Sequence, residues 1–178
     1  MSFKYIPNAL TIFRVLIVPF FIMFFLGSGF MNRLISLALF FIGSITDFFD
    51  GYIARKYNYI TDFGKLIDPF ADKILIISAL LLLNNFYPDS IKLWMVIAII
   101  SRDIFITLYR YILIRKKIVM RTSIFAKSKT LLQIIIIHIV LIYHAFYNDI
   151  SINSLYNFNY FIYLLMVICT VLTILTGI

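Results

Sequence analysis

Long apolar stretches alternate with short polar breaks along the whole chain. Each stretch is about as long as the ~20 residues that an α-helix needs to cross a bilayer, and the breaks are too short to form a domain. The pattern therefore predicts an all-α, polytopic membrane protein with six transmembrane helices, in a single membrane domain that covers residues 1–178. The predicted helices cover residues 9–27, 33–53, 66–87, 92–114, 123–147 and 155–177.

The composition excludes a water-soluble globular domain of ordinary type. Of the 178 residues, 63% are hydrophobic and 13% are charged, and the mean hydropathy is +1.01. The net charge of +8 arises from 16 Lys and Arg residues against 8 acids. In a membrane protein, such an excess indicates cytoplasmic loops beside anionic headgroups, so we expect membrane lipid rather than nucleic acid as a partner.

The cations between the apolar stretches fall mostly on one side of the predicted bilayer. Lys and Arg are retained on the cytoplasmic side. Ten of them lie at the N-terminus and in the second-to-third and fourth-to-fifth connections, whereas the opposite face has only Arg33 and Lys92. This asymmetry predicts that both basic connections and both chain ends are cytoplasmic. The ten are Lys4, Arg55, Lys56, Lys65, Arg115, Lys116, Lys117, Arg121, Lys127 and Lys129.

All eight acids are Asp, and four of them stand at regular spacings around the second-to-third connection. One helix face, at offsets of 0, 3, 4 and 7, carries Asp47, Asp50, Gly51 and Ala54. A stripe with steps of four on the next helix carries Gly64, Asp68 and Asp72. Because consecutive helices with a short connection are usually antiparallel neighbours, we expect the four carboxylates to meet at the cytoplasmic ends of these two helices.

Four carboxylates at close quarters repel one another unless cations compensate their charge. The ligand set contains only oxygen, and the segment has no His or Cys, so the composition favours Mg²⁺ or Mn²⁺ over zinc. Two acidic pairs on facing helices suggest two divalent cations. Such a pair of metals suits the binding of a diphosphate and an in-line displacement at phosphorus.

Residues 47–72 have the pattern D-x2-D-G-x2-A-R-x8-G-x3-D-x3-D, which resembles the signature of the CDP-alcohol phosphatidyltransferase family at all eight fixed positions. The resemblance implies six transmembrane helices, a homodimer, and an active site on the cytoplasmic face of the cell (inner) membrane. It also implies the transfer of a phosphatidyl or related group from a CDP-linked donor to an alcohol, with release of CMP.

The resemblance also implies roles for individual positions of the motif. Asp72 would act as the general base that takes the proton of the acceptor hydroxyl. The metal ligands would be Asp47, Asp50, Asp68 and Asp72. The CDP site would be lined by Gly51, Ala54, Arg55 and Gly64.

Further stretches resemble two branches of the family, both of which use CDP-diacylglycerol as the donor. Residues 6–14 and 68–73 are similar to both branches, one of which uses glycerol 3-phosphate as acceptor and the other, the cardiolipin synthases, phosphatidylglycerol. Residues 127–133, K-S-K-T-L-L-Q, resemble the glycerol 3-phosphate branch, although Ala126 replaces its glycine. The dipeptide Arg102-Asp103 instead resembles the cardiolipin branch.

These features favour glycerol 3-phosphate as acceptor, with cardiolipin synthesis as the alternative and serine or inositol phosphate as further acceptors. Both leading acceptors carry a phosphate, so cations must lie near the metals. Tyr111 stands where the glycerol 3-phosphate branch has an acid, which weakens the match around Arg110. The residues expected to bind the acceptor phosphate are Arg102, Arg110, Lys127 and Lys129.

A cation transporter is the alternative from a different class, because intramembrane acids also line ion pathways. It predicts charges at the bilayer midplane and an internal repeat. The sequence has no such repeat and its acids cluster at one predicted face, so we favour the enzyme.

Several polar residues also have a plainer interpretation. Arg14 can snorkel to the interface or contact the donor phosphates. Arg102 and Asp103 can pair with other buried groups, and His138 and His144 are expected to be packing or interfacial residues.

Overall fold

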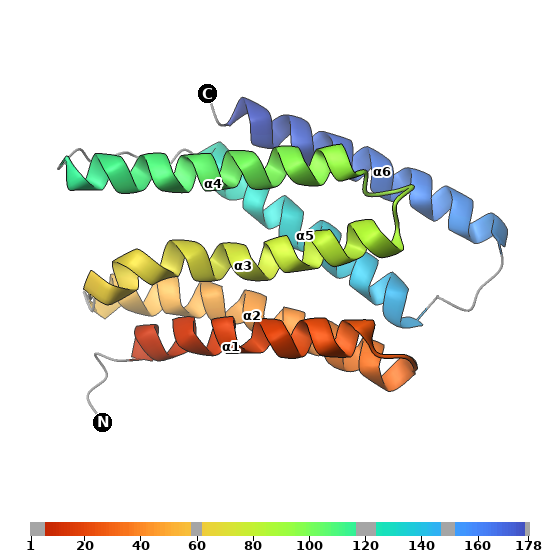
Figure 1. Cartoon of the computed structure of the whole chain (residues 1–178), viewed down its shortest axis with the longest axis horizontal. Helices are drawn as coiled ribbons and strands as arrows, with labels where there is room; N and C mark the ends of the chain where they lie inside the picture. Colours follow the sequence, from red (N-terminus) through yellow and green to blue (C-terminus); the bar gives the residue numbers. More distant parts are fainter. Residues whose placement is uncertain (1–5, 58–61, 117–123, 147–151, 177–178) are drawn as a thin grey trace. The chain divides into compact units, whose positions relative to one another are not determined.

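A computed structural model describes residues 6–57, 62–116, 124–146 and 152–176 of the chain (Figure 1). In this part of the chain the secondary structure is helical, with no strand, which confirms the all-α prediction. The helices are α1 (Ile6–Leu26), α2 (Phe30–Tyr57), α3 (Asp62–Phe86), α4 (Leu93–Arg115), α5 (Ile124–Phe146) and α6 (Ile152–Leu175).

The helix bounds agree with the apolar stretches to within three residues, except around the second-to-third connection, where they differ by four. There α2 continues to Tyr57, beyond the predicted end at 53, and α3 begins at Asp62, before the predicted start at 66. Hydropathy misses these ends because they carry polar and charged residues, whereas a helix continues wherever its backbone hydrogen bonds can form. Some side chains within the helices lie outside the described part of the structure, namely those of residues 6–8, 47–57, 62–69, 72, 110, 114–115, 124–127 and 152–156.

Within the described residues, three helices contain an apolar window long enough to cross a membrane. These windows are Ala9–Leu26, Ser128–Phe146 and Asn157–Leu175. Shorter apolar segments occur at Phe30–Thr46 in α2 and Lys73–Phe86 in α3. The structure therefore supports a membrane protein, while the count of six transmembrane helices stays a prediction.

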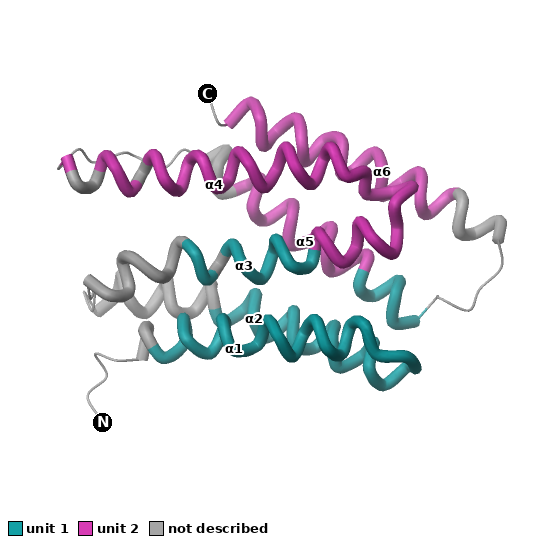
Figure 2. The backbone as a smooth tube through the Cα atoms, viewed as in Figure 1, with its two compact units in different colours: residues 1–79, 141–148 teal, residues 80–140, 149–178 magenta. Residues whose placement is uncertain are grey.

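The chain divides into two compact units, each of which is described by itself (Figure 2). Unit 1 comprises residues 1–79 and 141–148, and unit 2 comprises residues 80–140 and 149–178. Both α3 and α5 contribute one part to each unit.

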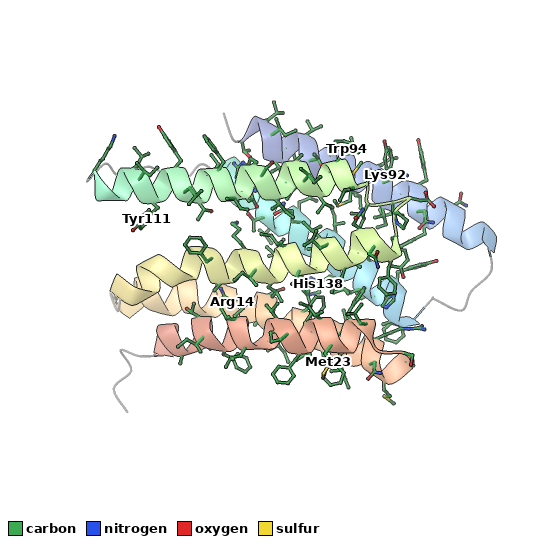
Figure 3. All side chains as sticks on the ribbon, viewed as in Figure 1. Arg14, Met23, Lys92, Trp94, Tyr111 and His138 are labelled. Atoms are coloured by element: carbon green, nitrogen blue, oxygen red, sulfur yellow. The ribbon has the colours of Figure 1, made fainter. Side chains whose placement is uncertain are left out.

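In unit 1, α1 packs against α2 through aromatic side chains. Phe21 and Phe40 are fully buried, and their ring centroids are 5.7 Å apart. The ring of His144 stacks on Phe25 at 4.7 Å, which confirms that this histidine is a packing residue. On the other side of α1, Met23 points away from these helices and is 57% exposed, as expected for a side chain that faces lipid (Figure 3).

Two glycines have structural roles in unit 1. A Cβ atom at Gly43 of α2 would lie 2.6 Å from Cδ2 of Leu75 in α3, so the absence of a side chain brings these two helices together. Gly29 has a φ of +96°, a conformation that other residues rarely adopt, and it forms the turn between α1 and α2.

In unit 2, α4 packs against α6, and hydrogen bonds fix the connection from α3 to α4. The amide of Asn84 donates to the carbonyl oxygen of Ile91 at 2.7 Å, and the hydroxyl of Ser90 donates to Oδ1 of Asn159 in α6 at 2.9 Å. Buried polar groups in a membrane protein need such partners, since lipid offers none.

Candidate active site

The eight motif positions fall within two continuous helices. Helix α2 includes Asp47, Asp50, Gly51, Ala54 and Arg55, and α3 includes Gly64, Asp68 and Asp72. Each set of positions can share one helix face only if the helix is unbroken there, and the bounds of α2 and α3 meet this requirement. The side chains themselves lie outside the described residues, so the carboxylate cluster stays a prediction. Within the part that the structure describes, no group of three or more His, Cys, Asp or Glu residues could hold a metal.

The four residues predicted to bind the acceptor phosphate have different outcomes in the structure. The side chains of Arg110 in α4 and Lys127 in α5 also lie outside the described residues. Arg102 of α4 and Lys129 of α5 are described, and the structure brings them together around one carboxylate in unit 2.

That carboxylate belongs to Asp103, whose side chain is 4% exposed. Its Oδ1 accepts a hydrogen bond from Nζ of Lys129 and another, at 3.1 Å, from Nη1 of Arg102. The Lys129 side chain is 3% exposed and that of Arg102 is 13% exposed, so all three charges lie almost entirely inside the protein. The pairing predicted for Arg102 and Asp103 is therefore confirmed.

Arg102 also reaches the C-terminal end of α6. Its Nη2 donates to the carbonyl oxygen of Thr176 at 2.6 Å and to the hydroxyl oxygen of the same residue at 3.1 Å. Carbonyl groups in the last turn of a helix lack intrahelical donors, and the helix dipole makes this end negative. The guanidinium satisfies one such carbonyl and complements the dipole, so one side chain joins α4 to the end of α6.

The cluster formed by Arg102, Asp103 and Lys129 carries two positive charges and one negative charge. The buried Nε of Arg102 is a further donor, and it has no hydrogen-bond partner in the described part of the chain. Net positive charge together with an unused donor is suited to bind an anion such as a phosphate.

A second polar side chain of α5 lies one turn after Lys129. Gln133 is 1% exposed, and neither its Nε2 nor its Oε1 has a hydrogen-bond partner among the described residues. The sequence pattern of residues 127–133 includes this glutamine but assigns no role to it. Its burial, like the contact of Arg102 with Thr176, depends on how the helices pack, and no local sequence signal encodes that.

The position of Arg14 contradicts one of its two predicted roles. A snorkelling arginine would place its guanidinium at the surface, whereas Arg14 is 1% exposed and lies inside unit 1. Snorkelling is therefore wrong for this residue. Its contact with donor phosphates stays a prediction.

The buried cluster predicts strong energetic coupling between Asp103 and Lys129. Replacing Lys129 with Met, or Asp103 with Leu, leaves a buried charge with fewer partners, and each change should lower the free energy of unfolding by about 3 kcal/mol. The Asp103→Leu/Lys129→Met double variant should be more stable than the sum of the single effects by about 1–3 kcal/mol. Thermal unfolding in detergent micelles measures these differences.

The matched control is the exposed pair of Asp89 and Lys92, whose side chains are 3.4 Å apart. Its coupling should stay below about 1 kcal/mol, because water screens exposed ion pairs. Additive effects at Asp103 and Lys129 would show that their contact does not stabilise unit 2.

Comparison with known proteins places the chain among membrane transferases. The family model for CDP-alcohol phosphatidyltransferase matches residues 4–175. A CDP-diacylglycerol–glycerol-3-phosphate 3-phosphatidyltransferase of Rickettsia felis is 39% identical over 139 residues, which are 78% of this chain and 76% of the relative. The proteins of the same name from Bacillus subtilis and Wigglesworthia glossinidia brevipalpis are 37% identical (82% of this chain, 81% of the relative) and 36% identical (74% of each).

These matches confirm the resemblance found in residues 47–72 and decide against a transporter. Members of the family generally depend on a divalent cation. Together with the three apolar helices of the described part, the matches establish an integral membrane protein. The chain belongs to the CDP-alcohol phosphatidyltransferase family, and it is a membrane-embedded transferase.

Proposed function

We propose that this chain transfers the phosphatidyl group of CDP-diacylglycerol to glycerol 3-phosphate and releases CMP, as a single catalytic membrane domain over residues 1–178. The observation that carries the proposal is the similarity over most of the chain to relatives that are named for this reaction. The K-x-K-T-x2-Q pattern at 127–133 supports the same acceptor. The dipeptide Arg102-Asp103 supports cardiolipin synthesis, with phosphatidylglycerol as acceptor, as the second candidate.

The donor set of α2 and α3 fits hard divalent cations, because it consists of carboxylates alone. Bound metal would neutralise the diphosphate and make its phosphorus more electrophilic. Two ions, Mg²⁺ or Mn²⁺, would be held by Asp47, Asp50, Asp68 and Asp72.

The residues of this chain then act on the substrates in defined roles. Gly51, Ala54 and Gly64 leave space for the cytidine diphosphate against the helix backbones, and Arg55 pairs with its charge. Asp72 takes the proton of the acceptor hydroxyl. The hydroxyl oxygen forms a bond to the phosphorus that carries diacylglycerol, and the bond from this phosphorus to the bridging oxygen breaks, so that CMP leaves with the electron pair.

The acceptor phosphate would bind the cations of α4 and α5. Among them, Arg102 and Lys129 form the described cluster with Asp103, in which the Nε of Arg102 remains available. Arg110 and Lys127 would complete the site from positions further toward the basic connection between these helices.

The distribution of cations supports an orientation in which this connection and the carboxylates are cytoplasmic, where a cytidine nucleotide and glycerol 3-phosphate are available. The protein would reside in the cell (inner) membrane as a homodimer, with the acyl chains of its substrate in the surrounding lipid.

The acceptor can be identified by measuring CMP release from CDP-diacylglycerol with Mg²⁺ or Mn²⁺ present. Purified protein should release CMP with glycerol 3-phosphate and not with phosphatidylglycerol alone. Release with phosphatidylglycerol only would establish the cardiolipin reaction, and release with neither would contradict both candidates.

Replacement of Asp72 tests the general base. Asp72→Asn keeps the size of the side chain but removes its ability to accept a proton, so CMP release should fall by at least about 100-fold. The unfolding temperature should change little. Asp89→Asn serves as control, because Asp89 is an exposed acid whose loss should leave the rate unchanged. Full activity of Asp72→Asn would remove the assignment.

A further inference from the structure

The amide of Gln133 is a buried polar group that the described residues do not satisfy. The residue is 1% exposed, and neither Nε2 nor Oε1 has a hydrogen-bond partner in the described part of the chain. An amide without partners in an apolar interior destabilises the folded protein as much as a broken hydrogen bond does. Each such group in a folded protein calls for an explanation, and a bound ligand that supplies the missing hydrogen bonds is one.

The position of Gln133 connects it to the charged cluster of unit 2. It follows Lys129 by four residues in α5, so the two side chains lie on one helix face, about 6 Å apart along the axis. Lys129 binds Asp103, and Asp103 also binds Arg102, whose Nε is a second buried donor without a partner among the described residues. Two buried polar groups without a partner among the described residues therefore belong to the same unit as Lys129.

The acceptor of the proposed reaction has a group that such an amide can bind. Glycerol 3-phosphate carries a phosphate, a primary hydroxyl and a secondary hydroxyl. The cations bind the phosphate of the acceptor. Its primary hydroxyl attacks the phosphorus of CDP-diacylglycerol that carries diacylglycerol, and loses its proton. The secondary hydroxyl does not react, yet it must exchange its hydrogen bonds with water for hydrogen bonds with the protein when the acceptor enters the site.

We infer that Gln133 is a specificity-determining residue, whose amide binds the secondary hydroxyl of the acceptor while Lys129 binds its phosphate. An amide both donates and accepts, as does a hydroxyl, so the two groups are complementary. Lys129 and Gln133 project from α5 about 6 Å apart along its axis, a spacing over which two long side chains can contact neighbouring groups of one three-carbon phosphate ester. This inference rests on the proposed function, since it assumes a glycerol-type acceptor.

The test compares glycerol 3-phosphate with propane-1,3-diol monophosphate, which has the same phosphate and primary hydroxyl but no secondary hydroxyl. The wild-type protein should use the analogue with a kcat/KM lower by about ten- to a hundred-fold, because the analogue leaves the amide of Gln133 unsatisfied. Gln133→Met, which has a similar volume but no amide, should use both acceptors with kcat/KM values within about three-fold of each other. The KM for CDP-diacylglycerol should not change.

Asn84→Leu is the matched control. This variant also removes a side-chain amide of unit 2, but that amide donates to the carbonyl of Ile91 within the protein. It should lower the unfolding temperature and leave the preference between the two acceptors as in the wild type. A merely structural role of Gln133 would give the same result as this control, with lower stability and unchanged preference.

The outcomes separate this inference from the proposed function. CMP release by the wild-type protein with glycerol 3-phosphate, together with loss of discrimination in Gln133→Met, supports both. Release with glycerol 3-phosphate but equal use of the analogue by the wild-type protein would overturn the role of Gln133 even if no variant folds, and would leave the function intact. A folded Gln133→Met protein that still prefers glycerol 3-phosphate over the analogue would also overturn the role of Gln133 and leave the function intact. A wild-type protein that releases no CMP with glycerol 3-phosphate would overturn the proposed function, and the inference with it.

Discussion

Charge inside an apolar helical protein must be compensated by the protein itself, and the carboxylate of Asp103 shows how this chain meets that requirement. It accepts hydrogen bonds from Lys129 and Arg102, and Arg102 extends the network to the carbonyl of Thr176. A charge at the centre of a membrane helix costs about 3 kcal/mol or more when it has no partner. The packing of α4, α5 and α6 in unit 2 therefore depends on one buried anion placed among two cations and a helix end.

The same arrangement prepares a site for an anion. A buried cation without a carboxylate partner would donate its hydrogen bonds to the nearest carbonyl or extend toward water. A cation that donates to Asp103 instead keeps a fixed position. The cluster keeps one net positive charge, and the Nε of Arg102 has no partner among the described residues, so a phosphate could bind there while the internal contacts remain. In the proposed function, structural stability and acceptor binding depend on the same three side chains, and substitutions in this cluster should affect both.

The sequence predicted the large features correctly because they depend on local properties. Apolar length alone located all six helices, and the spacing of the acids around Asp50 and Asp68 was sufficient to identify the family. It did not predict the contact of Arg102 with Thr176 or the burial of Gln133, since both depend on which helices are neighbours. Hydropathy also could not decide the position of Arg14, because the cost of burying its charge depends on partners that lie elsewhere in the chain.

The central claim is that the acids of α2 and α3 form an oxygen-only site for two divalent cations, on which the transfer reaction depends. Electron paramagnetic resonance of Mn²⁺ measures the number of bound ions directly, without reliance on turnover. With CDP-diacylglycerol present, the account predicts two bound Mn²⁺ ions per chain, and a loss of binding in the Asp47→Asn and Asp68→Asn variants. No bound Mn²⁺ in the wild-type protein, or equal binding in these variants, would contradict it.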